Sequence, residues 1–168
     1  MGQHKILCGD PCSGHDIGRL MTGCRADLAF LDPLPNMRGP APTCDTLRAD
    51  GFLSATLHAA ASVSRAAAVH FVCSDQRRLA EVLANAIPVY GDPIDVAVWV
   101  NPTFDRGSLY RNQIEFIEVF GVGATPPYIA HRQPRSNLWH HVPVTSPFYG
   151  DQSAKPIALD PGRHRAIV

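Results

Sequence analysis

The sequence predicts an α/β fold with a mainly parallel sheet, and two observations indicate it. Short apolar runs, each about the length of one strand, alternate with segments whose apolar residues recur at helical spacing. The run at residues 28–31 is apolar throughout, which is typical of a strand covered on both faces. The 168 residues, of which 45% are hydrophobic, suffice for one domain with a core of its own.

The predicted strands are the apolar runs bounded by turn residues, at 5–8, 28–31, 68–73, 95–100 and 114–120. Three helices are predicted between them, at 13–21, 52–65 and 75–87. Ser13 is the expected N-cap of the first helix, and Pro88 is expected just past the end of the third. The last two strands are neighbours in sequence, so they are able to form an antiparallel edge of the sheet.

We expect a single domain over residues 1–168 with two parts of different character. Residues 1–120 form the α/β core, and residues 121–168 are rich in Pro, Gly, His and Arg with little periodicity. That second part is predicted to consist of long loops that hold target-recognition and cofactor-side elements or pack on the sheet.

Charge and composition exclude several classes of protein. The formal net charge is zero and the pI is about 7.1, so any contact with DNA requires a local basic patch. No signal peptide or membrane-spanning run is evident, and we expect a cytoplasmic protein without a membrane partner. Cys8, Cys12 and His15 suggest a zinc cluster, but no second cysteine pair follows at finger spacing, and we expect no metal site.

An acid and a proline directly follow the run at residues 28–31. Ligands of open α/β sheets bind beyond the carboxyl ends of the strands, which is where Asp32 is expected. Pro33 keeps Asp32 out of the helical region and fixes the turn. Asp32 is therefore either a site residue or an acid that makes an Asx turn at the end of a strand.

The sequence around Asp32 resembles a motif of DNA methyltransferases that modify exocyclic amino groups, on adenine N6 or cytosine N4. Asp32-Pro33-Leu34-Pro35-Asn36 is similar to their Asp-Pro-Pro-Tyr-Asn motif. Further segments resemble the same family in the same order. They are Ile6-Leu7-Cys8-Gly9-Asp10, the strand and helix start at 68–75, Val98-Trp99-Val100-Asn101, the Gly-Ser-x-Tyr-Arg-x-Gln-x-Glu pattern at 107–115, Arg135-Ser136-Asn137-Leu138-Trp139 and Lys155-Pro156-Ile157-Ala158-Leu159.

This order resembles the permuted group of these enzymes, in which the target-base motif comes first. In that group a strand leading into Asp-Pro-Phe-x-Gly-x-Gly follows the Lys-Pro segment. Leu159-Asp160-Pro161-Gly162 resembles only the start of that motif, and no second glycine follows in register. The resemblance therefore implies an incomplete three-layer, Rossmann-like methyltransferase fold in a truncated chain.

The resemblance also implies roles for individual residues. Asp32 and the Pro33 carbonyl would accept hydrogen bonds from the target amino group, after the base has left the stack. S-adenosylmethionine (SAM) would be the cofactor, and DNA the partner. The remaining motif residues would lie on the substrate side, and a second set would contact the cofactor. The substrate-side residues are Leu34, Pro35, Asn36, Tyr110, Arg111 and Gln113, and the cofactor-side residues are Asp32, Lys155 and Pro156.

The motif departs from the family pattern at two positions, one of which is that of the family's tyrosine. Pro35 occupies the place of the tyrosine that stacks on the extruded base, and Leu34 that of the second proline. Base–aromatic stacking contributes ~1–3 kcal/mol, so impaired or absent activity is expected. Two alternatives stay open: a catalytically inactive remnant that binds DNA, and one half of a split methyltransferase whose second chain supplies the glycine-rich motif.

Overall fold

The computed structural model describes residues 4–33, 51–105, 109–123, 136–140 and 166–167. Its helices are α1 (Gly14–Met21), α2 (Phe52–Ser62) and α3 (Leu79–Tyr90). Its strands are β1 (Ala26–Leu31), β2 (Ser64–Ser74), β3 (Asp95–Asp105), β4 (Asn112–Gly121), β5 (Leu138–His140) and β6 (Ala166–Ile167). Helices and strands alternate along the first half of the chain, as the sequence predicted.

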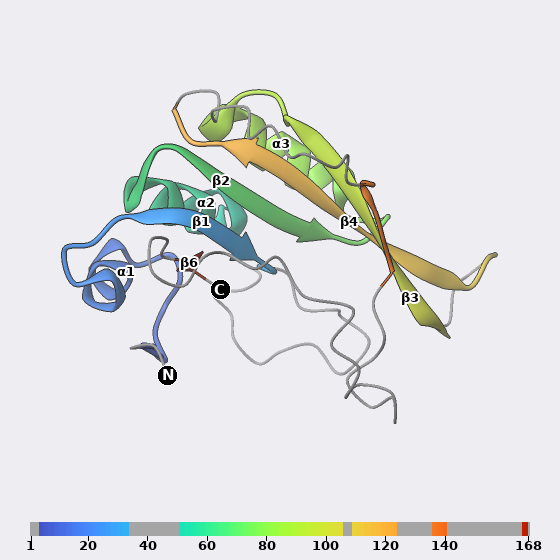
Figure 1. The fold of residues 1–168 in the computed structure, drawn as a ribbon, viewed down its shortest axis with the longest axis horizontal. Coiled ribbons are helices and arrows are strands. Elements are labelled where there is room, and N and C mark those ends of the chain that lie inside the picture. The colour runs from blue at the N-terminus through green and yellow to red at the C-terminus, as the bar shows by residue number, and fades with distance from the viewer. Residues whose placement is uncertain (1–3, 34–50, 106–108, 124–135, 141–165, 168) are drawn as a thin grey trace.

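The described strands form one open sheet of six strands in the order β5-β3-β4-β2-β1-β6 (Figure 1). β1 pairs in parallel with β2 on one side and with β6 on the other, and β3 pairs in parallel with β5. β4 is antiparallel to both β2 and β3. The predicted mainly parallel sheet is confirmed, and its antiparallel strand lies inside the sheet because β3 and β5 pair beyond it.

All three helices in the described part of the chain pack on the same face of the sheet; Figure 1 shows α2 and α3 behind it. Leu57 of α2 and Val82 of α3 are fully buried against Val72 and Phe120 of the sheet. Met21 of α1 packs with Ala26 and Ala29 of β1. This layer anchors the middle strands and so determines where their carboxyl ends lie.

The opposite face of the sheet bears aromatic side chains. Cys73, Ala97 and Ile117 are buried there, and partly buried aromatic rings pack around them. Phe71 contacts both Phe30 and Trp139, with ring centroids 6.1 and 6.2 Å apart. Trp139 explains why β5 forms inside the segment expected to be loops: its ring packs onto this face although the strand is too short to show periodicity.

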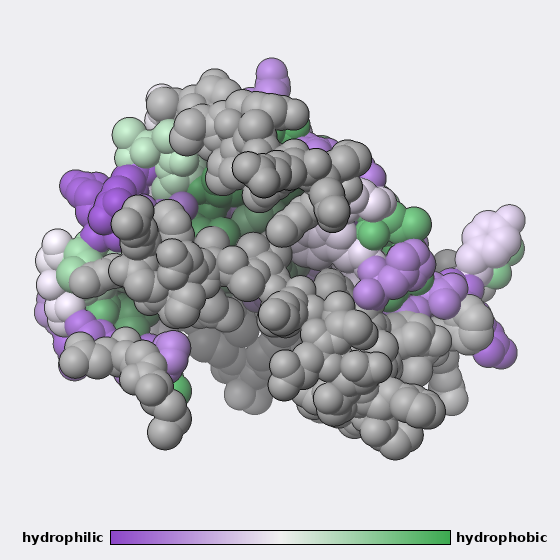
Figure 2. Space-filling view, viewed as in Figure 1, coloured by the Kyte–Doolittle hydropathy of each residue, from purple (hydrophilic) through white to green (hydrophobic). Residues whose placement is uncertain are grey.

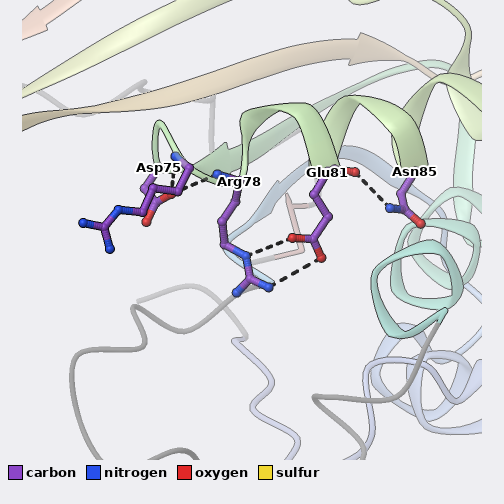
Figure 3. Close-up of polar contacts among 5 residues, drawn as sticks. Asp75, Arg78, Glu81 and Asn85 are labelled. Carbon is purple, nitrogen blue, oxygen red and sulfur yellow. Dashed lines mark hydrogen bonds and ion pairs between the residues drawn. The ribbon is translucent and has the colours of Figure 1, made fainter.

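A local polar contact caps α1, and others hold the turn that precedes α3. Ser13 accepts a hydrogen bond from the Asp16 amide at 3.2 Å, which confirms it as the N-cap of α1. At α3, the Asp75 carboxylate accepts from the amides of Arg77 and Arg78, at 2.8 and 3.0 Å (Figure 3). Figure 3 also shows Arg78 paired with Glu81, at 3.1 Å from Nε to Oε2.

Some local predictions were wrong. The third helix begins at Leu79 rather than at residue 75, because residues 76–78 form a turn. Residues 5–8 are not a strand: the edge of β1 that an opening strand would occupy pairs with β6, and Ile6 is 99% exposed. Pro88 does not follow α3 but lies in its last turn, and the helix ends at Gly91, whose φ of 84° suits glycine. None of the described helices has the length and apolar character needed to span a membrane.

Candidate functional site

Asp32 and Pro33 lie directly beyond the carboxyl end of β1, which is an interior strand of the sheet. Leu31 pairs with Val72 of the parallel strand β2, so Asp32 follows β1 at the level where Cys73 and Ser74 end β2. The Asp32 side chain is exposed, and partial desolvation raises the pKa of its carboxyl. An exposed acid at this edge is available as a hydrogen-bond acceptor for a ligand.

Further acids gather around the same strand ends. Burial first, and then the negative charges of Asp32, Glu115 and Glu118, raise the pKa of the Cys73 thiol to about 12. Cys73 is therefore a protonated, buried packing residue rather than a nucleophile. The electrostatic influence of three carboxyl groups on one thiol indicates that this edge of the sheet has an acidic character.

Glu118 is a fully buried acid on the helix-covered face of β4. Ser74 Oγ donates a hydrogen bond to its Oε1 at 2.7 Å, and its Oε2 has no partner among the described residues. Burial is the largest influence and raises the pKa of Glu118, although the Ser74 hydrogen bond opposes it. A buried carboxyl group thus connects β4 to the end of β2, next to the start of the segment that leads into α3.

No motif in the sequence points to Glu118, although its position along β4 does. Glu118 has the same parity along β4 as Phe116 and Phe120, which are two residues before and after it. Residues of one parity share one face of a strand. An acid between two phenylalanines on that face predicts a buried carboxyl group, and this alternation could have identified it.

The predicted substrate-side residues in and just before β4 lie at the same edge of the sheet as Asp32, but farther from the middle of the sheet. Tyr110 is 80% exposed and Arg111 is exposed, both just before β4, while Gln113 is half-buried within it. Tyr110 precedes Phe116, the residue paired with Ser74, by six positions, which corresponds to roughly 20 Å of extended chain. The structure does not bring Tyr110 or Arg111 next to Asp32.

The other predicted site residues lie outside the described residues. They are Leu34, Pro35, Asn36, Lys155 and Pro156. Within the described ranges, no group of three or more His, Cys, Asp or Glu side chains is arranged to hold a metal ion.

Comparison with known proteins identifies the fold. No family model and no curated protein matches the sequence. Among solved structures, M1.HpyAVI in complex with SAM is similar at a TM-score of 0.57 and 13% identity, over 84% of this chain and 66% of that one. A second structure of M1.HpyAVI is similar at a TM-score of 0.55 and 11% identity, over 82% of this chain and 66% of that one. TTHA0409 of Thermus thermophilus, a candidate DNA modification methylase, gives 0.43 and 12% identity, over 71% and 53%.

The chain thus spans 66% of the length of M1.HpyAVI. At this level of identity the likeness concerns the arrangement of helices and strands, not the chemistry. The expected fold class is confirmed: the chain has an α/β fold with a mainly parallel sheet that is similar to that of M1.HpyAVI, and Asp32 lies at the carboxyl end of one of its interior parallel strands.

Proposed function

We propose that the chain acts on DNA as a SAM-dependent methyltransferase of exocyclic amino groups, on adenine N6 or cytosine N4. One observation supports this most strongly: Asp32-Pro33 ends an interior parallel strand in the fold shared with M1.HpyAVI, a protein solved with SAM. The motif resemblance at Asp32-Pro33 and the similarity of the fold to M1.HpyAVI both support this function.

Asp32 would hold the target amino group at the end of β1. Its exposed carboxylate accepts N–H hydrogen bonds, and the Pro33 carbonyl supplies a second acceptor. Two acceptors on the amino hydrogens keep the nitrogen lone pair directed away from them, towards the methyl donor. The amino nitrogen gains a methyl group and then loses one proton, for which Asp32 or water is the acceptor.

The charge of this corner fits the cofactor. SAM has a sulfonium and an ammonium group, and the exposed Asp32 carboxylate has the opposite charge. When bound, SAM supplies an electrophilic methyl group. We propose that Asp32, Lys155 and Pro156 lie on its side of the site.

Leu34 and Pro35 support low activity of this chain. Neither side chain has a π face on which an extruded base could stack. Losing ~1–3 kcal/mol of stacking weakens the hold on that base by about tenfold to a hundredfold. A second chain that supplies a glycine-rich turn remains an alternative, and so does DNA binding without catalysis.

The test measures transfer of a tritiated methyl group from SAM to unmethylated genomic DNA, with mass spectrometry of the digested nucleosides. We expect weak transfer that Asp32→Ala abolishes and that Asp92→Ala, an exposed acid in the loop before β3, leaves unchanged. The double substitution Leu34→Pro/Pro35→Tyr should increase transfer by about tenfold or more because it restores the stacking ring.

Each outcome distinguishes the candidates. Methylated adenine or cytosine that depends on Asp32 supports the enzyme. No transfer, even from the restored double variant, together with salt-dependent binding to duplex DNA supports the inactive DNA-binding protein. Absence of both transfer and DNA binding contradicts the proposal.

A further inference from the structure

The β3–β4 hairpin extends past the rest of the sheet at the edge where Asp32 lies. β3 is parallel to β2, since β4 is antiparallel to both, so β3 ends at the same edge as β1 and β2. β2 ends at the pair of Ser74 with Phe116, whereas β3 and β4 continue past a register shift after Val100 and pair again at Asp105 with Asn112. Figure 1 shows the ends of β3 and β4 projecting beyond those of β1 and β2.

We call this projection the arm; its described residues are 101–105 and 109–115. Asn112 lies four positions beyond Phe116, or roughly 14 Å at the rise of a strand, and Tyr110 lies farther out. At 3.4 Å per base pair, a reach of roughly 14 Å spans about four base pairs of a duplex that lies along the edge.

Two large apolar side chains are exposed together on the arm. Leu109 is 83% exposed and Tyr110 is 80% exposed, and Arg111 beside them is also exposed. At the right of Figure 2 a protrusion combines pale and green surface with purple. Adjacent exposed apolar residues on a projecting element indicate a contact surface.

The composition of the arm favours a nucleic acid as its partner. Its described residues 109–114 contain Arg111 and no acid, which suits a phosphate, whereas Asp105 and Glu115 flank them in the arm. A tyrosine ring stacks on bases, and a leucine is among the residues that insert between base steps. A second copy of the chain is a poorer fit, because a stable dimer needs roughly 800 Å² from each partner, far more than two side chains supply.

We infer that the arm is a DNA-contacting element in which Tyr110 stacks on a base and Arg111 pairs with a phosphate, several base pairs from the base held at Asp32. This inference rests on the proposed function, since it takes duplex DNA as the substrate. It adds a second contact that is separate from the target-base corner.

The test is fluorescence anisotropy with a labelled 30-base-pair duplex of mixed sequence, using the full chain at several salt concentrations. Tyr110→Ala should weaken binding about tenfold without changing the salt dependence, because stacking is not ionic. Tyr110→Phe keeps the ring and should bind as the native chain does. Arg111→Ala should weaken binding and reduce the salt slope by about one. Ile94→Ala is the matched control, since Ile94 is 50% exposed at the opposite end of β3.

Three results would overturn the inference, and they differ in what they say of the proposed function. If Tyr110→Ala binds the duplex as tightly as the native chain, the arm is not a DNA contact, while the proposed function stands. If Tyr110→Ala changes only the sedimentation coefficient, the arm is a self-association surface. If the native chain binds no duplex at all, the inference and the DNA-directed function fail together. Circular dichroism melts of each variant confirm that the fold is intact.

Discussion

A buried histidine makes the stability of this fold sensitive to mild acid. His70 of β2 is fully buried between α2 and α3. Its Nε2 lies 2.9 Å from Ser64 Oγ and its Nδ1 lies 2.9 Å from the Tyr90 hydroxyl. Burial lowers the pKa of His70 from 6.5 to about 4. The folded protein therefore holds the imidazole neutral at pH values where the unfolded chain protonates it.

The sign and size of the effect follow from linkage. Because the folded pKa lies below the unfolded one, the stability contributed by neutral His70 is complete above pH 6.5 and is lost as the pH falls towards 4. Each pKa unit corresponds to about 1.36 kcal/mol, so the total is about 3 kcal/mol. Between pH 7.5 and pH 5 the expected loss in the free energy of unfolding is about 2 kcal/mol.

Urea denaturation of the native chain and of His70→Gln across this pH range measures the loss. The variant cannot titrate at this position, so its stability should fall by about 2 kcal/mol less than that of the native chain between pH 7.5 and 5. His70→Phe is a second non-titrating variant, in which Ser64 and Tyr90 keep the carbonyl acceptors of Ala60 and Leu57 at 2.8 and 3.1 Å. Equal pH dependence in the native chain and both variants would refute the reasoning.

Three further changes probe other parts of the structure. Glu118→Gln should raise the free energy of unfolding in urea at pH 8 but not at pH 4. Burial raises the pKa of Glu118 in the folded protein, so the stability that its protonated form contributes is lost as the pH rises through that folded pKa. A gain confined to pH 4 would contradict this. Leu57→Ala should lower the free energy of unfolding by ~2–5 kcal/mol, because it removes buried apolar contacts. Ile87 is exposed, so Ile87→Ala should change the free energy of unfolding by less than ~0.5 kcal/mol. Similar effects of the two substitutions would refute the assigned core. Calorimetry should detect SAM binding weaker than micromolar, because residues 1–168 contain no Asp-Pro-Phe-x-Gly-x-Gly motif; micromolar affinity would contradict this.

The strands and helices of the middle of the chain were predictable because local patterns and tertiary pairing agree there. The runs at 28–31, 68–73, 95–100 and 114–120 each lie inside an observed strand, and the apolar spacing of the helices matches the face that they bury. Residues 5–8 show the opposite case. Their apolar pattern predicts a strand, but a strand forms only where a neighbour has a free edge, and pattern alone does not reveal that β6 pairs there.

The candidate site was predictable in part, for a similar reason. The position of Asp32 follows from an apolar run, an acid and a proline, all of which are local. The bond between Ser74 and Glu118 joins residues 44 positions apart and depends on the antiparallel register of β2 and β4. The distance of Tyr110 from Asp32 likewise depends on how far β3 and β4 extend beyond β2, which the motif does not encode.

Chemical-shift mapping by NMR tests the central claim, that DNA binds at the carboxyl edge of the sheet around Asp32, without requiring activity. The isotope-labelled chain is titrated with an unlabelled duplex of mixed sequence. We predict shifts in the amides of Leu31 and Asp32, at the ends of β1 and β2 and along the arm, with little change around Asp92 and Ile94 at the opposite edge. Shifts confined to that opposite edge, or no shifts at all, would contradict the account.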